Sequence, residues 1–405
     1  MSQTADPLVS STTRTAVAVR VPLLDLKGQY QSLAAEVLPI LQEICESQQF
    51  ILGRHVTQFE KAAAVYCRCH EAVGVSSGTD ALLLALMALG VGNGDAVITT
   101  PYTFFATAGT IARAGARPLF CDIDAASFNI DPLTVRRTLQ ERCERRNGAW
   151  IERTSGARVR VLMPVHLYGQ CADMVALQSI ADEYGLKIIE DAAQAIGADT
   201  GDGRRAGSIG DIGCLSFFPT KNLGAFGDAG MCTTQDPALA EHMRVLRVHG
   251  GKPKYHHAFI GGNFRLDEIQ AAVLQVKLRY LDGWTAGRQR NAGYYTRAFT
   301  QAGLATRVGL PQVVPGARHI WNQYVVRVPR RDALRAFLAE SGIGTEIYYP
   351  LPLHRQQCFA YLGHAEGDFP ISEQAAAETL ALPIFPELRA EQLQYVVERI
   401  AAFYS

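Results

Sequence analysis

The chain has 405 residues, of which 39 are basic and 39 acidic, so its formal net charge at neutral pH is zero. This balance gives no electrostatic basis for binding nucleic acid or an anionic membrane surface. Hydrophobic residues make up 48% of the chain, which is ample material for a buried core, and the length favours one large and one smaller domain.

The first 20 residues are rich in Ser, Thr and Ala and lack the apolar segment of a signal peptide. We expect residues 1–20 to form a mobile tail. No apolar run reaches the roughly 18 residues that a membrane-spanning helix needs. These observations predict a cytoplasmic protein.

From residue 72 onward, short apolar segments alternate with segments of helical character. We expect strands at 72–75, 96–99, 118–122, 159–165, 187–190, 214–218 and 230–233, and helices at 80–89, 105–114 and 267–281. Strands that are apolar throughout and separated by helices are typical of an α/β fold with a mostly parallel central sheet covered by helices. The charged, glycine-containing segment 142–156 is interpreted as a solvated excursion between a helix and the next strand.

The pattern changes after about residue 285. Here we expect helices at 288–299, 332–341 and 390–402 and a strand at 322–328. We therefore predict a large domain over 21–285 and a smaller C-terminal α+β domain over 286–405.

The nine cysteines are scattered through the chain. Cys121, Cys214 and Cys232 fall in or beside expected strands, which favours buried thiols over a disulfide framework. The run from Cys67 to His70 has no second Cys/His pair at zinc-site spacing, so we expect no metal site.

Polar and aromatic residues follow several expected strands, where ligands bind to parallel sheets. Gly78 and Thr79 precede a helix, so their segment is either a phosphate-binding loop or an ordinary capped turn. Phe104 either stacks on a flat ring or packs in the core. The dinucleotide-binding pattern GxGxxG is absent from this loop, which argues against a nicotinamide-dependent enzyme.

Lys221 stands alone in an apolar, glycine-rich run. Burial disfavours the charged amine, and a neutral amine can form a Schiff base with a carbonyl. Asp191 follows an apolar strand, where it either caps the next segment or holds a pyridinium nitrogen protonated. A Schiff-base lysine and such an acid are what pyridoxal phosphate requires of a protein, with Gln194 and Ser216 as candidates for its hydroxyl and phosphate groups. Asn263 precedes the expected helix 267–281, where a helix cap and an anion contact are equally plausible.

Taken together, these motifs resemble the DegT/StrS family of sugar aminotransferases, which are fold-type I pyridoxal phosphate enzymes. The resemblance runs from about residue 22 to the C-terminus, in order. It is carried by GTDAL at 78–82, YTF at 102–104, VHLYGQCADM at 165–174, EDAAQ at 190–194, SFFPTK at 216–221, GNFRLD at 262–267, YYPLPLH at 348–354 and LPIFP at 382–386. The long N-terminal tail and the segment 142–156, which looks like an insertion, depart from the family pattern.

The resemblance implies a role for each cofactor-site residue. Lys221 forms the Schiff base and moves the proton, and Asp191 pairs with the pyridine nitrogen. Gln194 contacts the ring hydroxyl, Phe104 stacks on the ring, and the phosphate is held by Gly78, Thr79 and Ser216. Asn263 reaches the phosphate in the neighbouring subunit, so a homodimer with active sites at its interface is expected.

Substrate contacts are assigned to five further residues, each of which has a structural role as an equally good explanation: Tyr255, His256, His257, His319 and His354. The resemblance implies amination of a nucleotide-linked keto sugar, dTDP- or UDP-linked, with L-glutamate as the amino donor. The run 254–257 favours a 3-keto over a 4-keto sugar.

Three alternatives remain at this point. Sugar dehydratases of the same fold carry histidine in place of the Schiff-base lysine, so Lys221 argues against them. A cyclitol (keto-inositol) aminotransferase keeps every cofactor residue. A non-catalytic regulatory protein on the same fold tolerates the loss of Lys221 or Asp191, and both are present.

Overall fold

The computed structural model describes residues 19–405, and it is built around a nine-stranded sheet. Along its main path the strands are β1 (Glu71–Val75), β9 (Gly230–Thr234), β8 (Ile212–Ser216), β7 (Lys187–Asp191), β6 (Arg158–Leu162), β2 (Asp95–Thr99) and β3 (Arg117–Phe120). Neighbouring strands from β8 to β3 are parallel, whereas β9 pairs antiparallel with both β8 and β1. The predicted mostly parallel sheet is confirmed.

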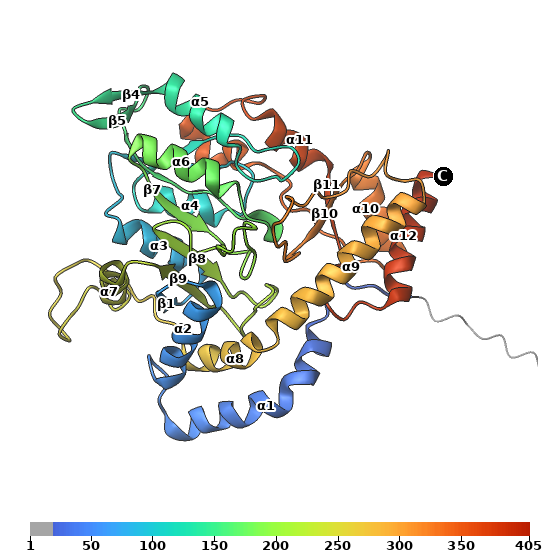
Figure 1. The fold of residues 1–405 in the computed structure, drawn as a ribbon, viewed down its shortest axis with the longest axis horizontal. Helices are drawn as coiled ribbons and strands as arrows, with labels where there is room; N and C mark the ends of the chain where they lie inside the picture. Colours follow the sequence, from blue (N-terminus) through green and yellow to red (C-terminus); the bar gives the residue numbers. More distant parts are fainter. Residues whose placement is uncertain (1–18) are drawn as a thin grey trace, which may run out of the picture.

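Helices cover both faces of this sheet, as the apolar strands require (Figure 1). Consecutive strand residues point to opposite faces, so Ile188 and Ile189 of β7 belong to different apolar clusters. One face packs against α2 (Arg54–Cys67), α8 (Glu268–Leu278), α5 (Pro132–Arg142) and α6 (Met174–Tyr184). The other packs against α3 (Gly78–Ala88), α4 (Ala106–Arg113) and α7 (Pro237–Leu246).

The C-terminal part has its own apolar core. It contains a two-stranded antiparallel sheet of β10 (Tyr324–Arg327) and β11 (Thr379–Leu382), with α10 (Arg331–Glu340), α11 (Pro370–Glu378) and α12 (Ala390–Tyr404). Val21 also packs in this core and pairs with Ile343 in a parallel bridge.

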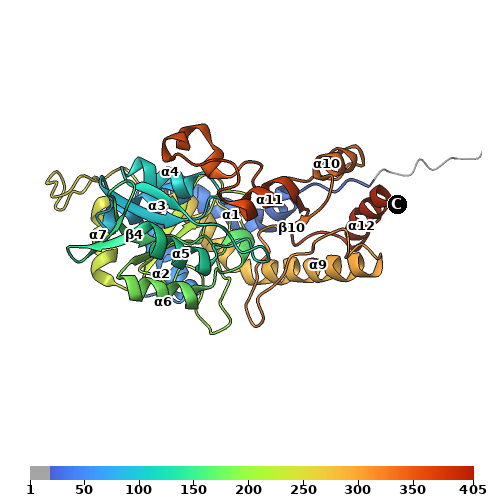
Figure 2. The same cartoon turned by 90° about the horizontal axis from the view of Figure 1, so that it is seen from above.

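The long helix α9 (Leu281–Gln301) runs from the large sheet to the C-terminal helices (Figures 1 and 2). It begins seven residues before the expected helix 288–299, so the predicted domain boundary at residue 285 falls inside its first turns. The division into domains at that residue stays a prediction.

Two N-terminal helices were not expected from the sequence pattern. These are α1 (Leu26–Ser47), which packs on α8, and α2. The segment 142–156, expected as a solvated excursion, forms an antiparallel hairpin of β4 (Cys143–Arg146) and β5 (Ala149–Glu152), and β5 pairs with the start of β6. The predicted tail lies outside the described residues, apart from the exposed residues Val19 and Arg20.

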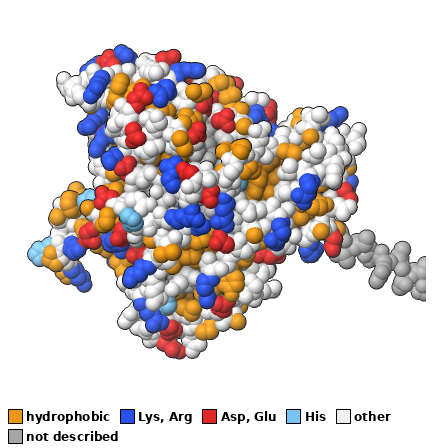
Figure 3. All heavy atoms as spheres, in the orientation of Figure 1, with side chains coloured by type: hydrophobic (Ala, Val, Ile, Leu, Met, Phe, Trp, Pro, Cys, Tyr) orange, Lys and Arg blue, Asp and Glu red, His pale blue; other side chains and the backbone are white. Residues whose placement is uncertain are grey.

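The surface carries charges of both signs interspersed on the face seen in Figure 3, in keeping with the balanced composition. Within residues 19–405, no helix is both long and apolar enough to span a bilayer. The buried thiols of Cys121, Cys214 and Cys232 are free, as predicted.

Glu268 at the start of α8 joins this helix to the start of α2. Its buried carboxylate accepts hydrogen bonds from the backbone N–H groups of Gly53 (2.8 Å), His55 (2.6 Å) and Val56 (3.3 Å). The first N–H groups of a helix have no partner within the helix, so a side chain from elsewhere must satisfy them. Glu268 therefore fixes the helix pair that supports one face of the sheet.

We expect Glu268→Ala to lower the free energy of unfolding by about 2–4 kcal/mol, because it leaves buried N–H groups without an acceptor. Glu268→Gln keeps one amide oxygen as an acceptor and should cost about half as much. Urea unfolding of the three proteins measures the difference. A loss below about 0.5 kcal/mol for Glu268→Ala would contradict the capping role.

Candidate active site

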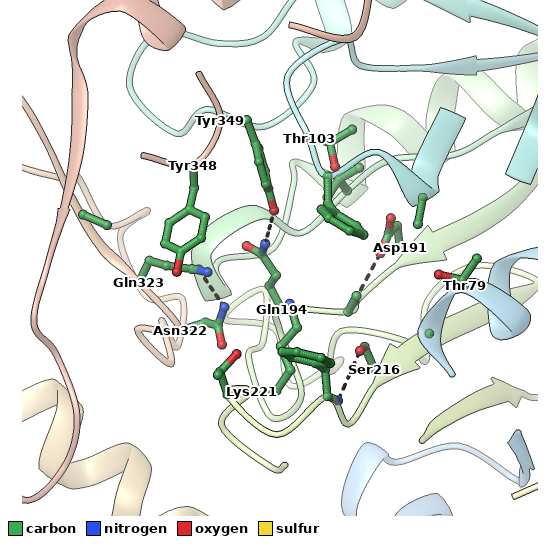
Figure 4. A pocket seen from close by; sticks show the side chains of 18 of the residues that line it. Thr79, Thr103, Asp191, Gln194, Ser216, Lys221, Asn322, Gln323, Tyr348 and Tyr349 are labelled. Atoms are coloured by element: carbon green, nitrogen blue, oxygen red, sulfur yellow. Dashed lines mark hydrogen bonds between the residues drawn. The ribbon is translucent and has the colours of Figure 1, made fainter. Parts of the chain in front are cut away.

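A cavity of about 600 Å³ opens at the carboxyl ends of β7 and β8, between the large sheet and the C-terminal part. The residues predicted for the cofactor site that line it together are Gly78, Thr79, Phe104, Asp191, Gln194, Ser216 and Lys221. Figure 4 shows Thr79, Ser216 and Asp191 on one side of the cavity, with Asn322 and Gln323 on the opposite side of Lys221.

One end of the cavity is suited to a small anion. Helix α3 begins there at Gly78, and Ser77 caps it by accepting a hydrogen bond from Asp80 N (3.0 Å). The free N–H groups of a helix start attract negative charge. A Cβ atom at Gly78 would lie 2.6 Å from Ser216 Cβ, so only glycine lets the helix start lie against Ser216. This cradle, formed by Gly78, Thr79 and Ser216, fits a phosphate group.

Asp191 lies at the end of β7 and is almost completely buried. Its Oδ2 accepts a hydrogen bond from Thr107 Oγ1 (2.7 Å), and its Oδ1 accepts one from Ala193 N (3.2 Å). Burial raises the pKa of the Asp191 carboxyl, although these hydrogen bonds and the positive charge of Lys221 favour the ionised form. A buried carboxylate held in this way can keep a bound cationic group protonated.

Lys221 follows β8 in the segment 217–227 and lies half-buried in the cavity wall. Burial lowers the pKa of its amine to about 8, and the charge of Asp191 opposes this decrease. A substantial fraction of the amine is therefore neutral near physiological pH, as a nucleophile or a proton acceptor needs to be.

Helix α8 holds the segment that carries Lys221. The buried Nζ of Lys277 donates a hydrogen bond to Gly224 O, and Gln270 Oε1 accepts one from Phe226 N (2.8 Å). The Lys277 ammonium also lies 5.6 Å from the centre of the Phe226 ring, within cation–π range. Burial lowers the pKa of Lys277 to about 8.

Aromatic and amide groups form another part of the cavity wall. Gln194 Nε2 donates to Tyr349 Oη (3.0 Å), and Gln194 Oε1 accepts from Tyr168 N (2.7 Å). The ring centre of Phe104 is 6.0 Å from that of Tyr349, and Phe104 is 56% exposed towards the open cavity. The exposed Phe104 face is available for stacking on a planar ligand.

Behind the cavity, a second buried carboxylate anchors β7. Glu190 accepts hydrogen bonds from Gly207 N (2.9 Å), Ile209 N (2.7 Å) and Gly210 N (2.7 Å) and lies 2.8 Å from His166 Nε2. These partners lower the pKa of Glu190 despite its burial. The anchored strand fixes the position of the adjacent Asp191.

The other predicted site residues do not line this cavity within one subunit. Asn263 and the triplet Tyr255, His256 and His257 lie on an exposed segment beside α7. His319 is buried and stacked on Trp321, with ring centres 3.8 Å apart, and burial lowers its pKa to about 3, so the ring is neutral. His354 Nε2 lies 2.9 Å from Glu373 Oε1 in an aromatic cluster. Their contacts with substrate stay predictions.

Sequence reasoning missed several residues that shape the cavity. The hydroxyl of Thr107 in α4 lies 3.0 Å from that of Thr103, which precedes the helix, so helical spacing in the sequence could not reveal this contact. Lys277 and Arg288 stand in ordinary amphipathic helix patterns that give no sign of a functional role. Within residues 19–405, no group of three or more His, Cys, Asp or Glu side chains is arranged to hold a metal ion.

Comparison with known proteins identifies relatives along almost the whole chain. The model of the DegT/DnrJ/EryC1/StrS aminotransferase family matches residues 31–401. A pleiotropic regulatory protein of Geobacillus stearothermophilus is 51% identical, covering 95% of this chain and 99% of the relative. The dTDP-3-amino-3,4,6-trideoxy-alpha-D-glucose transaminase of Streptomyces venezuelae is 41% identical (94% and 95%). The UDP-N-acetyl-3-dehydro-alpha-D-glucosamine 3-aminotransferase of Acidithiobacillus ferrooxidans is 40% identical (92% and 95%).

Solved structures agree with this relationship. S. venezuelae DesV in complex with a ketimine intermediate has a TM-score of 0.87 at 41% identity, covering 95% of this chain and 98% of that chain. NtdA from Bacillus subtilis with bound cofactor PMP has a TM-score of 0.84 at 28% identity, covering 96% and 85%.

The lowered pKa of Lys277 predicts a pH-dependent contribution to stability. Between about pH 8 and pH 10.5 the unfolded state binds more protons at this lysine than the folded state, so stability rises with pH there. We expect Lys277→Met to have a smaller rise in unfolding free energy from pH 8 to pH 10 than the wild type. Urea unfolding at both pH values measures it, with the exposed Lys252→Met as the control. Equal slopes in all three proteins would contradict the lowered pKa of Lys277 in the folded state.

Proposed function

The chain belongs to the DegT/DnrJ/EryC1/StrS aminotransferase family, and from this premise we propose that it transfers an amino group to a nucleotide-linked keto sugar. In this proposal the cofactor is pyridoxal phosphate, the amino donor is L-glutamate, and the product enters amino-sugar biosynthesis. The observation that carries the proposal is the convergence of Lys221, Asp191 and the Gly78–Ser216 cradle on one cavity.

The donor groups of the cavity fit pyridoxal phosphate. The cradle at the start of α3 would hold its phosphate, the buried carboxylate of Asp191 would pair with its ring nitrogen, and Phe104 would supply a stacking surface. Gln194 retains a second amide hydrogen for the ring hydroxyl. When bound, the cofactor supplies an electron sink for the bond that breaks at the substrate carbon.

Lys221 has the two properties that transamination demands of one residue. Its amine is partly neutral at physiological pH, so it can bond to the cofactor carbonyl. With the cofactor bound, the same Nζ would take a proton from the substrate carbon that bears the nitrogen and would return it to the carbon on the other side of that nitrogen. Segment 217–227, held by Lys277 and Gln270, keeps Nζ in place for both tasks.

The relatives narrow the substrate class. Both transaminases compared above are named for a sugar aminated at position 3, one dTDP-linked and one UDP-linked. At the end of the cavity away from the phosphate cradle, Asn322, Gln323 and Tyr348 offer amide and hydroxyl groups to the hydroxyls of a sugar ring. The names of the two relatives favour a 3-keto over a 4-keto sugar.

We further propose a homodimer, with Asn263 reaching the phosphate in the partner subunit. Asn263 is exposed and lies outside the cavity of its own subunit, as a residue that serves a neighbouring site would. The adjacent segment with Tyr255, His256 and His257 is equally exposed and is the candidate for substrate contacts across the interface.

A regulatory role is the second candidate function, since the relative at 51% identity is named a pleiotropic regulatory protein. The retained Lys221 and Asp191, together in one cavity, favour catalysis over that role. A keto-inositol acceptor is the alternative within transamination, because it would use the same cofactor residues.

We expect the purified protein to show the visible absorbance of lysine-bound pyridoxal phosphate, and Lys221→Ala to lose both this absorbance and transamination. Lys221→Arg keeps the positive charge without a nucleophilic amine and should be equally inactive. Absorbance spectra and a coupled 2-oxoglutarate assay measure these effects. Turnover retained in either variant would overturn the assignment of Lys221.

The acceptor class is tested with a panel of ketones. Wild-type protein, pyridoxal phosphate and L-glutamate are incubated separately with dTDP- and UDP-linked 3-keto and 4-keto sugars and with keto-inositol. We expect amination of a nucleotide-linked 3-keto sugar, detected by mass spectrometry of the product. Amination of keto-inositol alone would replace the substrate class, and amination of none, with the glutamate reaction also absent, would favour the regulatory role.

A further inference from the structure

Arg288 of α9 lines the same cavity, and the roles proposed above do not use it. It is only 5% exposed. Its Nη1 donates hydrogen bonds to Trp321 O (2.9 Å) and Asn322 O (3.3 Å). Because Asn322 lies across Lys221 from Thr79 in Figure 4, Arg288 belongs to the end of the cavity opposite the phosphate cradle.

Much of the Arg288 guanidinium has no partner in the described part of the chain. Both of its hydrogen bonds use Nη1. Nε and Nη2 form no hydrogen bond with the described residues, and neither atom is fully enclosed by protein. Both are therefore accessible from the cavity that Arg288 lines. No carboxylate among residues 19–405 forms an ion pair with Arg288. The negative charge of Glu387 raises the pKa of the guanidinium, but without direct contact.

The charge of Arg288 persists at neutral pH. Burial lowers the pKa of the guanidinium to about 10, which still leaves it protonated. Taking such a charge out of water is costly unless an anion or a set of hydrogen bonds compensates it. An unpaired, buried guanidinium in a cavity wall is therefore a site for an anionic ligand group.

We propose that Arg288 binds a carboxylate group of the amino-acid donor. This inference rests on the proposed function and adds the residue that recognises the donor. The planar fork of a guanidinium matches the two oxygens of a carboxylate. The donor amine must lie near Lys221, so its carboxylate reaches the end of the cavity that lies away from the phosphate cradle, where Arg288 is.

The surroundings of Arg288 favour a small anion over the diphosphate of a nucleotide. Leu23, Leu382 and Ile384 line the same cavity and contribute an apolar wall. The cavity of about 600 Å³ must also contain the cofactor and the sugar ring. A bulky, strongly hydrated diphosphate is therefore better placed at the mouth, whereas a carboxylate fits the buried end and gains from its low dielectric.

A purely structural role is the competing explanation, and Arg331 provides a matched control. Its Nη1 also donates to two backbone carbonyls, Ala376 O (2.9 Å) and Thr379 O (3.1 Å), and it is 9% exposed. Unlike Arg288, it pairs with Asp332 and does not line the cavity. Arg331→Gln thus removes similar backbone contacts without removing a charge from the cavity.

The first measurement is binding of glutarate, the dicarboxylate that corresponds to glutamate without its amine. Calorimetric titration compares wild-type, Arg288→Gln, Arg288→Lys and Arg331→Gln proteins loaded with pyridoxal phosphate. We expect Arg288→Gln to weaken binding about tenfold or more, and Arg331→Gln to change it less than about twofold. Arg288→Lys, which keeps the charge without the fork, should lie between them.

The second measurement separates the two halves of the reaction. Single-turnover absorbance follows the reaction of bound pyridoxal phosphate with L-glutamate, with 4-aminobutyrate, which lacks the α-carboxylate, and with L-2-aminobutyrate, which lacks the γ-carboxylate. Arg288→Gln should slow the reaction with glutamate about tenfold or more, while the donor that lacks the Arg288-bound carboxylate reacts alike in both proteins. Keto-sugar amination by protein preloaded with pyridoxamine phosphate should change less than about threefold.

Two results would overturn the proposal. One is the absence of glutarate binding to the wild-type protein, or the absence of competition between glutarate and L-glutamate. This test uses the wild-type protein alone and so does not depend on the folding of a variant. The other is an equal loss in both halves of the reaction, or equal effects of Arg288→Gln and Arg331→Gln. Wild-type protein that reacts with no amino acid would overturn the proposed function, and glutarate binding would still decide the role of Arg288.

Discussion

The half-buried amine of Lys221 and the buried carboxylate of Asp191 share one cavity, and contacts from several helices and strands hold both groups in place. Lys221 alone would be driven to the neutral form by burial, and Asp191 alone would be driven to accept a proton. Each moderates the other through its charge. Thr107 from α4 and Ala193 hold the carboxylate, while α8 holds the segment that carries the amine. The parallel strands bring these groups together because β7 and β8 end at the same edge.

The sheet and the pairing of Lys221 with Asp191 in one cavity could be predicted from the sequence, because each has a strong local signature. Apolar strands alternate with helices, and Lys221 and Asp191 stand out in apolar runs. The residues at which helices begin and end could be predicted less accurately. Helix α3 begins at Gly78, ahead of the expected residue 80, because Ser77 caps it, and a cap is decided by one hydrogen bond.

Residues that act through distant contacts could not be predicted in this way. Lys277 looks like an exposed charge in an amphipathic helix until α8 is seen to lie behind segment 217–227. Arg288 likewise acquires meaning only when α9 passes the cavity. The reverse holds for His319 and His354: their residue type suggested chemistry, but within the subunit His319 stacks on Trp321 and His354 is hydrogen-bonded to Glu373. The charged composition of 142–156 indicated a solvated excursion but not its hairpin, because charged residues also form edge strands.

The pairing of Val21 with Ile343 means that the C-terminal part is assembled from both ends of the described chain. Val21 N donates to Gly342 O (3.0 Å), and Gly344 N donates to Val21 O (2.8 Å). During synthesis on the ribosome, the residues of the large sheet emerge while the partners of Val21 are still to be made. The apolar residues beside Val21 therefore stay exposed to solvent until the last third of the polypeptide has been synthesised. The closing of this long loop is thus a late event, and the cavity wall that Leu23 contributes is completed only then.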